Sequence, residues 1–385
     1  MKRVWLLSLA VLLISTISFP IVYFHYIIGS NSVNEDFFFG ISFGSHNVTE
    51  AKLMINKVKD YTNLILINNY DLIANENETA FNEICQYAVD SDMYFMVFFD
   101  WISRTTYPWH QTWLDTAKER FGEKFLGVHL YDEPGGKQIE IGHWNAEDVN
   151  LLENVSEYNE AAEVYVSELT STNSAKDLRK RNIPVFTSDY ALYWFDYLAD
   201  YDAVFVELGW NHSITKHIAL DRGAANVQNK DWGAIIVWTY RNPPYIASGE
   251  QILEEMITAY RAGAKYVVIF NFPHEQPYGI LDDEHFAAME TFWNMTHSSN
   301  HDSLEKVEVE AAFVLPKDYG WGMRWQDDRI WQPEWGPDNK SQLIWDNMKK
   351  LIDKYGLRLD IIYNDTRFDF TEKYSEIYYW NSVIE

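Results

Sequence analysis

Between residues 37 and 296, short apolar runs alternate with amphipathic segments, and this alternation constrains the fold more than any other feature. The apolar runs are typical of buried strands and cover residues 37–44, 63–69, 93–101, 125–133, 184–189, 203–207, 231–240 and 265–273. Eight such repeats over roughly 260 residues predict a parallel (β/α)8 barrel. A doubly wound open sheet is the alternative, but the first run is not followed by the glycine-rich phosphate turn of that fold.

A linker at 297–309 precedes a smaller unit, with predicted strands at 310–315, 358–363 and 376–380 and a predicted helix at 341–355. We therefore predict an α/β protein with a TIM-barrel domain at 31–300 and a small, partial, Rossmann-like unit at 305–385. Four tryptophans lie between Trp321 and Trp335. This segment could fold over the barrel mouth and add stacking subsites for sugars, or it could plug the interface between the two units.

The fourth run, FLGVHLYDE, ends in an acid and is followed by Pro-Gly-Gly, which predicts that the strand stops in a turn. Side chains alternate along a strand, so Glu133 shares a face with His129 and Tyr131. We expect this face to look into the barrel, with Glu133 last at the carboxyl end, where barrel enzymes place catalytic groups. The opposite face, expected to pack against helices, carries Leu126, Val128, Leu130 and Asp132.

The other predicted strands also end in polar or aromatic residues, which a barrel gathers on one face around a pocket. Glu207 ends an apolar strand and has no adjacent salt-bridge partner in the sequence. Cleavage of a glycosidic bond needs two carboxyl groups, one acid and one nucleophile or base, and we assign Glu133 and Glu207 to this pair. The predicted substrate-binding residues are Asp100, Trp101, Tyr131, Asp132, Trp210, Trp238, Tyr240 and Asn271, and Glu275 is a further candidate acid.

Structural roles compete with these functional ones. Glu133 could pair with Arg104 or Arg241, and Asp100, Asp132 and Asp189 could cap helices or form turns. We expect His129 to be a core histidine with satisfied hydrogen bonds rather than a ligand. The sequence contains no HExxH, CxxC, Walker or dinucleotide-binding motif, so we predict neither a metal nor a cofactor.

At Tyr-Asp-Glu-Pro and in its eight repeats, the chain resembles the clan of (β/α)8 glycoside hydrolases that place a Glu acid/base at the end of strand four, often as Asn-Glu-Pro. The resemblance covers roughly residues 37–296 and implies that Glu133 is the acid/base. Asp132 stands where the clan has Asn, and strand seven ends in Trp238-Thr239-Tyr240, without the clan's nucleophile Glu. The unit after the barrel is similar to part of the amidotransferase-like domain that follows the barrel in the family 42 β-galactosidases.

Net charge and the amino terminus indicate partners and location. The formal net charge of −26 repels phosphate backbones, which excludes nucleic acid and suits a neutral carbohydrate. Lys2 and Arg3 precede an apolar run at 5–28, which predicts a transmembrane signal-anchor within residues 1–30 and an extracytoplasmic body, or secretion if this segment is cleaved. An extracytoplasmic, N-glycosylated surface agrees with seven Asn-x-Ser/Thr sequons, at Asn47, Asn77, Asn154, Asn211, Asn294, Asn339 and Asn364.

The sequence thus predicts a membrane-anchored, extracytoplasmic barrel protein of glycoside hydrolase type, without a cofactor. A non-catalytic glycan-binding protein is the alternative, favoured by the missing strand-seven Glu. A third possibility is a cell-envelope component whose barrel serves only as a scaffold and whose mouth is blocked, for instance by the tryptophan-rich segment.

Overall fold

The computed structural model describes residues 37–44, 47–68, 77–99, 109–140, 151–209, 212–237, 247–271, 278–297, 304–332 and 334–384. The predicted signal-anchor at 1–30 lies outside these residues. Within them, none of the helices has the length and apolar character that crossing a membrane requires. Residues 38–385 form one compact unit. The predicted division at 300–305 therefore stays a prediction.

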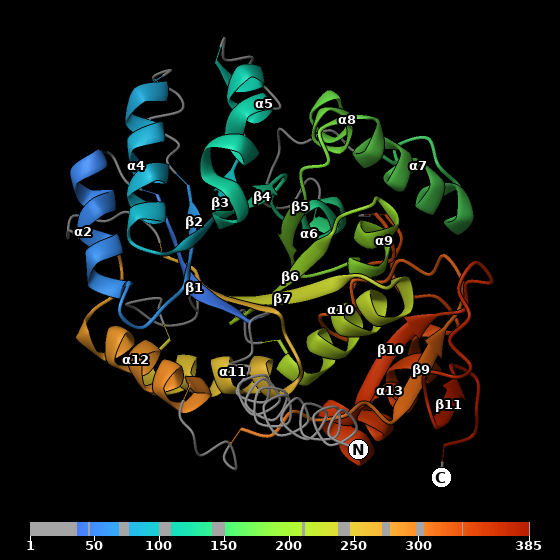
Figure 1. The fold of residues 1–385 in the computed structure, drawn as a ribbon. Coiled ribbons are helices and arrows are strands. Elements are labelled where there is room, and N and C mark those ends of the chain that lie inside the picture. Colours follow the sequence, from blue (N-terminus) through green and yellow to red (C-terminus); the bar gives the residue numbers. More distant parts are fainter. Residues whose placement is uncertain are drawn as a thin grey trace, which may run out of the picture. The chain divides into compact units, whose positions relative to one another are not determined.

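Eight parallel strands close into a barrel, which confirms the predicted (β/α)8 fold (Figure 1). Each strand pairs with the next along the chain, and the last pairs with the first. The strands are β1 (Phe38–Phe43), β2 (Leu64–Ile67), β3 (Tyr94–Phe98), β4 (Phe125–His129), β5 (Val185–Asp189), β6 (Ala203–Leu208), β7 (Asp231–Ile236) and β8 (Tyr266–Ile269). Most are shorter than the apolar runs that predicted them, because a run continues into the loop after its strand.

Helices cover the outside of the barrel (Figure 1). They are α2 (Val48–Val58), α4 (Glu78–Asp90), α5 (His110–Phe121), α6 (Pro134–Glu140), α7 (Tyr158–Ser171), α8 (Asn173–Lys180), α9 (Tyr193–Leu198), α10 (Ile214–Gln228), α11 (Gly249–Arg261) and α12 (Asp283–His297). The sequence did not predict α6, α9 or α10. Pro134 begins α6 rather than a turn, because proline suits the first position of a helix. α10 is buried around most of its circumference and therefore lacks a polar stripe.

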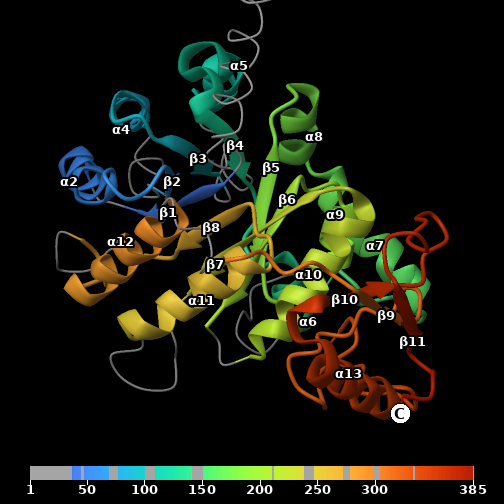
Figure 2. The same ribbon diagram turned by 60° about the horizontal axis from the view of Figure 1, so that its bottom comes forward.

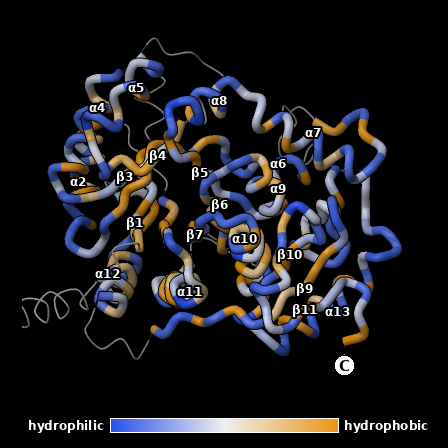
Figure 3. The backbone as a smooth tube through the Cα atoms, turned by 45° about the vertical axis from the view of Figure 1, so that its right-hand side comes forward, coloured by the Kyte–Doolittle hydropathy of each residue, from blue (hydrophilic) through white to orange (hydrophobic). Residues whose placement is uncertain are grey.

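Apolar side chains fill the barrel interior and leave its carboxyl end for polar groups. The interior cluster consists of Phe38, Leu64, Leu66, Met96, Phe98, Phe186, Ala203, Phe205, Ile235, Val237, Tyr266 and Val268. The rings of Phe186 and Tyr266 both lie within 5.9 Å of the Phe205 ring. In Figure 3 the strands β1, β3 and β4 are correspondingly drawn mostly in the hydrophobic colour. The barrel is therefore a packed core, and a ligand can only be met at its ends.

A bulge at the start of β4 corrects one predicted side-chain direction. The pairing of β3 with β4 shifts by one residue at Gly127, which has φ +148°. A Cβ atom there would meet Pro184 O at 2.3 Å, so only glycine fits. Leu126 consequently packs against the interior cluster, and the prediction that it faces the helices was wrong. Val128 and Leu130 do face outward, where they line a small cavity together with Leu114 of α5.

The carboxy-terminal part forms a three-stranded parallel sheet of order β10-β9-β11, built from β9 (Ala311–Leu315), β10 (Leu359–Tyr363) and β11 (Glu376–Tyr379). A single longer helix, α13 (Ser341–Tyr355), connects β9 to β10 and has the bounds that the sequence predicts. The sheet lies beside α10 of the barrel (Figure 2). Arg222 of α10 and Asp360 of β10 form a buried ion pair of 2.7 Å across this contact.

Candidate functional site at the carboxyl end of the barrel

Glu133 lies in a tight turn between β4 and α6, not on the strand as predicted. β4 ends at His129, and both Tyr131 and Glu133 adopt left-handed backbone conformations, with φ of +57° and +54°. The Glu133 N–H donates to Ser188 O at 2.9 Å, and its carbonyl accepts the N–H of Lys137 in the first turn of α6. Non-glycine residues in this conformation cost free energy and are enriched at functional sites.

The carboxyl group of Glu133 is partly buried, and its pKa is raised well above the ordinary value. Burial is the main cause, and the charge of Glu207 is the next. Asp132 and Asp189 raise this pKa further, whereas the ammonium group of Lys137 lowers it. Glu133 therefore holds its proton at a pH at which an ordinary glutamate has lost it, as a general acid must.

Glu207 occupies the inner face of β6, directly beyond Phe205 of the interior cluster, because side chains on one face recur every second residue. It is buried, with 5% of its surface exposed. The charge of Glu207 raises the pKa of Glu133, so the two carboxyl groups interact electrostatically although β4 and β6 are not adjacent in the barrel. Their roles as a catalytic pair stay a prediction.

Asp132 lies on the same side as this pair, although the alternation along the predicted strand placed it opposite Glu133. Its carboxylate accepts a 3.1 Å hydrogen bond from Ser188 Oγ, and it lies 3.8 Å from Lys137 Nζ. The prediction failed because the chain leaves the strand at His129, after which alternation no longer holds. Asp132 adds negative charge beside Glu133 and supports its raised pKa.

Asp189, at the end of β5, is a helix-capping residue. Its carboxylate accepts hydrogen bonds from the backbone N–H groups of Gly135 and Gly136 in α6, and from Tyr190 and Ala191. Burial raises its pKa to about 6, although these four donors oppose the shift. The capping role, left open by the sequence, is therefore correct for Asp189, and it fixes α6 immediately behind Glu133.

Tyr190 is a neighbour of the site that the sequence did not reveal. It is almost completely buried, and a Cβ atom at Gly136 would meet its ring at 2.2 Å, so the ring packs directly on the first turn of α6. Burial raises the pKa of its hydroxyl, and the largest charge contribution comes from Glu133. The second glycine of Pro-Gly-Gly is the only sequence signal, since it marks a place of close packing.

His129 lies in the apolar core beneath the site, as predicted, but its hydrogen bonds are not satisfied. It is 1% exposed and stacks on Phe98 with ring centroids 4.9 Å apart. Among the described residues neither ring nitrogen has a hydrogen-bond partner. Burial lowers its pKa to about 4, so the ring is neutral at physiological pH.

Asn271 follows β8, and the adjacent loop uses its side-chain amide. Its Nδ2 donates to Tyr278 O at 2.9 Å, and its Oδ1 accepts from the Ile280 N–H at 3.1 Å. The structure therefore assigns it a loop-closing contact, and its predicted ligand contact stays a prediction. At Tyr131, the carbonyl oxygen accepts a hydrogen bond from Thr187 Oγ1. Several predicted residues lie outside the described part of the chain, namely Asp100, Trp101, Trp210, Trp238, Tyr240 and Glu275, together with the potential partners Arg104 and Arg241.

The tryptophan-rich segment, residues 319–335, packs mainly against the barrel's helices. Trp331 is fully buried, with its ring 4.4 Å from Phe195 of α9 and 5.8 Å from Tyr165 of α7. Its carbonyl accepts a hydrogen bond from Gln138 of α6. Trp321 is buried as well, whereas Trp325 is 45% exposed. For Trp331 these contacts favour the plug over the sugar-stacking interpretation, whereas the ring of Trp321 packs on Trp345 of α13, 5.9 Å away.

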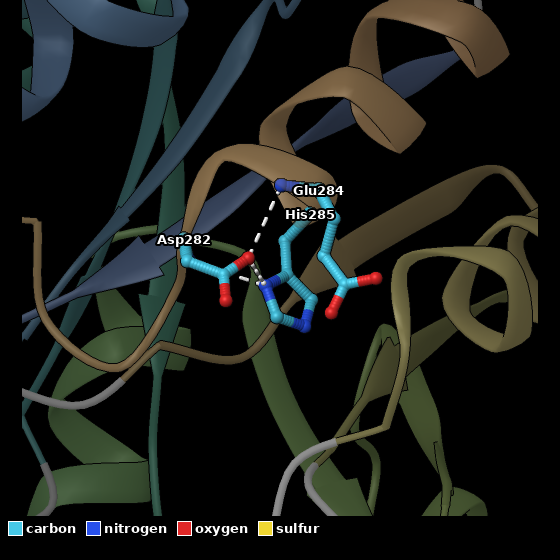
Figure 4. A group of neighbouring side chains, drawn as sticks. All are labelled: Asp282, Glu284 and His285. Carbon is cyan, nitrogen blue, oxygen red and sulfur yellow. Dashed lines mark hydrogen bonds and ion pairs between the residues drawn. The ribbon is translucent and has the colours of Figure 1, made fainter.

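One group of potential metal ligands occurs in the described residues, at the start of α12, where Figure 4 shows Asp282, Glu284 and His285 close together. Both ring nitrogens of His285 are engaged, since Nε2 donates to Ala247 O at 2.8 Å and Nδ1 accepts from the Asp282 N–H at 3.1 Å. Asp282 Oδ1 accepts from the Glu284 N–H. These contacts are those of a helix start, and we infer no metal from them.

Comparisons with known proteins identify the fold. The sequence matches no protein-family model and no curated protein. Over 89% of its length the chain is similar in structure to α-L-fucosidase isoenzyme 2 from Paenibacillus thiaminolyticus, with a TM-score of 0.52 and 11% identity, and it spans 59% of that chain. A GH5_18 protein from Bifidobacterium longum in complex with Manβ1-4GlcNAc matches with a TM-score of 0.48 at 10% identity, covering 90% of this chain and 96% of that one. At such identities the likeness shows the fold alone.

Proposed function

We propose that this protein hydrolyses glycosidic bonds, with Glu133 as the general acid and Glu207 as the nucleophile or base. The observation that carries the proposal is the pairing of two buried or partly buried acids at the carboxyl end of one barrel. In (β/α)8 enzymes this end holds the active site. The fucosidase that shares the fold is a glycosidase by name, and the neutral hydroxyl groups of a glycan suit a strongly acidic protein.

We base the proposed roles on the environments of the two acids. Glu133 keeps its proton because burial and neighbouring negative charge disfavour its anion, so it can protonate the oxygen of the leaving sugar. Glu207 then acts as the carboxylate, either attacking the anomeric carbon or removing a proton from the attacking water. Deprotonated Glu133 takes a proton from water in the first route and is reprotonated from solvent in the second.

We also propose that the catalytic body is extracytoplasmic and anchored through residues 1–30. One described feature supports this location: each sequon asparagine in the described residues is exposed, and these are Asn47, Asn77, Asn154, Asn294, Asn339 and Asn364. Attachment of a glycan requires such exposure. Partial protease digestion of intact cells tests this location. Residues 31–385 should be released into the medium, where an antibody detects them, only if they lie outside the cell membrane.

The second candidate is a glycan-binding barrel without catalysis. β7 carries Ile235 and Val237 on its inner face, both part of the apolar core, so the described end of this strand supplies no acid where the glycoside hydrolase clan places its nucleophile. If this candidate is correct, the protein binds glycans without hydrolysing them, and Glu133 and Glu207 have no catalytic role.

Single amide substitutions test the proposal. We expect Glu133→Gln and Glu207→Gln each to abolish release of reducing sugar from a panel of oligosaccharides and aryl glycosides, while glycan affinity is retained. Glu119→Gln is the matched control, since Glu119 is an exposed acid on α5. Unchanged turnover in Glu133→Gln removes this residue from the mechanism. Binding without turnover in the wild-type protein establishes the second candidate.

A further inference from the structure

A second cavity lies between the start of α7 and the tryptophan-rich segment. Its volume is about 350 Å³, and it is lined by Ser156, Glu157, Tyr158, Trp335 and Gly336. This volume falls within the range of sites for small ligands. None of its residues belongs to a barrel strand or to the turn before α6 that holds Glu133, and its lining includes neither Glu133 nor Glu207.

The aromatic wall of this cavity is held in place before any ligand arrives. The ring of Tyr158 lies 5.4 Å from Trp335 and 5.6 Å from Tyr319. Asp338 accepts hydrogen bonds from the hydroxyl of Tyr319 at 2.7 Å and from that of Tyr158 at 3.4 Å. Its other acceptor contacts, to the N–H groups of Lys340 and Ser341, anchor it to the start of α13. Two partly exposed rings are therefore fixed at one angle, which lowers the entropic cost of stacking a ligand on them.

Glu157 supplies a carboxylate that the fold does not use. It occupies the capping position of α7, yet its side chain makes no capping hydrogen bond. Glu160 instead reaches back to the Ser156 N–H, at 3.4 Å. Glu157 is exposed, and no hydrogen bond or ion pair of its side chain occurs within the described chain. An uncommitted acceptor thus lies beside two fixed aromatic rings.

We propose that this cavity binds one pyranose ring of a glycan, stacked against Trp335 and Tyr158, with Glu157 accepting its hydroxyl groups. An amphipathic sugar ring fits this combination, because its C–H face packs on aromatic carbon while its hydroxyls need acceptors. The carboxylate of Glu157 rejects acidic sugars by repulsion and accepts neutral and amino sugars. This site goes beyond the hydrolase proposal and does not depend on it.

The sugar can come from two sources. Ser156, which lines the cavity, is the hydroxyl residue of the Asn154 sequon, and Asn339 lies three residues after Gly336. Both asparagines are exposed. The ring that occupies the cavity is therefore either part of a glycan attached to this chain or part of a separate glycan, and the chemistry of recognition is the same.

Fluorine NMR on 5-fluorotryptophan-labelled protein separates these cases and tests the site. In full-length protein from a non-glycosylating host, methyl glycosides of mannose, galactose and glucosamine, each added at about 50 mM, should shift the Trp335 resonance, which Trp335→Phe identifies. We expect Glu157→Gln to weaken binding about tenfold, which is 1.4 kcal/mol, and to admit methyl glucuronide. The Trp325 resonance, from an exposed tryptophan elsewhere in the same segment, should not move.

In protein from a glycosylating host, occupancy by an attached glycan shifts the Trp335 resonance before any sugar is added, and Asn154→Gln or Asn339→Gln reverses that shift. Occupancy by a separate glycan requires added sugar in both hosts. A Trp335 resonance that stays unmoved under every one of these conditions overturns the proposal. Hydrolysis is measured separately, and its absence leaves the Trp335 result unaffected, so failure of either proposal can be recognised independently.

Discussion

Buried charged groups are neutralised by partners of opposite charge where the barrel contacts the carboxy-terminal sheet. At the ends of β4 to β6, they lie beside groups of the same charge. At the sheet contact, Arg222 and Asp360 lie 2.7 Å apart, and the second oxygen of Asp360 accepts hydrogen bonds from Asn226 and Tyr374. Arg222 also donates to the carbonyl oxygens of Leu357 and Leu359. The buried charge is therefore neutralised completely, as a purely structural contact requires.

At the strand ends, acids neighbour other acids instead. The charge of Glu207 raises the pKa of Glu133, and burial together with the charge of Asp189 raises the pKa of Asp196 on α9. Asp189 itself accepts four hydrogen bonds from backbone N–H groups. Neighbouring acids keep protons and reduce the stability of the fold at neutral pH. The contrast supports the proposal that Glu133 and Glu207 serve chemistry, whereas Arg222 and Asp360 join the sheet to the barrel.

The largest expected effect is the loss of glycan turnover in Glu133→Gln, which also tests whether Glu133 stabilises the fold. Glu133→Gln should lower glycan turnover by about 10²–10⁴-fold, because it removes the transferable proton of the general acid. The same variant should be at least as stable as the wild type at pH 7.5, since a neutral amide needs no proton to remain buried. Turnover assays and urea unfolding of the same preparation test both statements. A loss of stability together with activity would show that Glu133 is a structural residue.

The second effect concerns the sheet contact. Asp360→Ala leaves the guanidinium group of Arg222 buried without its carboxylate and should lower the free energy of unfolding by about 3–5 kcal/mol. Urea unfolding monitored by tryptophan fluorescence measures the loss. Replacing both partners with apolar residues of similar volume, Arg222→Met with Asp360→Leu, should recover most of it. A loss below about 1 kcal/mol in the single variant would break the comparison.

The third effect is the pH dependence of stability. Burial raises the pKa of Asp189 to about 6 in the folded protein, against about 3.9 in an unfolded chain. The folded state therefore binds more protons between these values, so the stability contribution is complete below about pH 4 and is lost as the pH rises through 6. A shift of two units corresponds to about 3 kcal/mol.

We expect the wild-type protein to unfold at lower urea concentration at pH 7.5 than at pH 4.5. In Asp189→Asn the free energy of unfolding should depend less on pH. The substitution should also lower this free energy by about 1 kcal/mol at all pH values, because one capping acceptor is lost. Glu133, Asp196 and Asp221 act in the same direction, since their pKa values are also raised. Stability that increases with pH would contradict the assignment of protonated acids at the strand ends.

The sequence predicts those parts of the fold whose pattern is local. Seven barrel strands lie within their predicted apolar runs, and β6 extends one residue beyond its run, to Leu208. α13 has its predicted bounds because one face is apolar and Gly356 follows it. Glu133 and Glu207 were found because acids that follow apolar runs are conspicuous. The bulge at Gly127 was not predictable, because it depends on the approach of Pro184 from the neighbouring strand.

The roles of other residues depend on contacts between segments that are distant in the sequence. Asn271 and Asp189 both follow strands, yet one closes a loop through Tyr278 and the other caps α6. Nothing in the flanking sequence distinguishes such residues from ligand-binding ones. The lack of hydrogen-bond partners for His129 among the described residues could not be inferred either, since it depends on which side chains fill the barrel interior. Local sequence patterns thus predict where strands and helices lie along the chain, whereas the roles of individual side chains depend on tertiary contacts.

The smallest expected effect provides the baseline for the comparison. Lys52 of α2 and Glu83 of α4 form a 2.7 Å ion pair in which both side chains are substantially exposed, at 32% and 52%. Solvent screens such a pair and ordering two long side chains offsets its attraction, so Glu83→Gln should change the free energy of unfolding by less than about 1 kcal/mol. Urea unfolding beside Asp360→Ala measures both under the same conditions. If Glu83→Gln and Asp360→Ala lost equal free energy of unfolding, the buried ion pair would contribute no more than a surface one, and the comparison would be wrong.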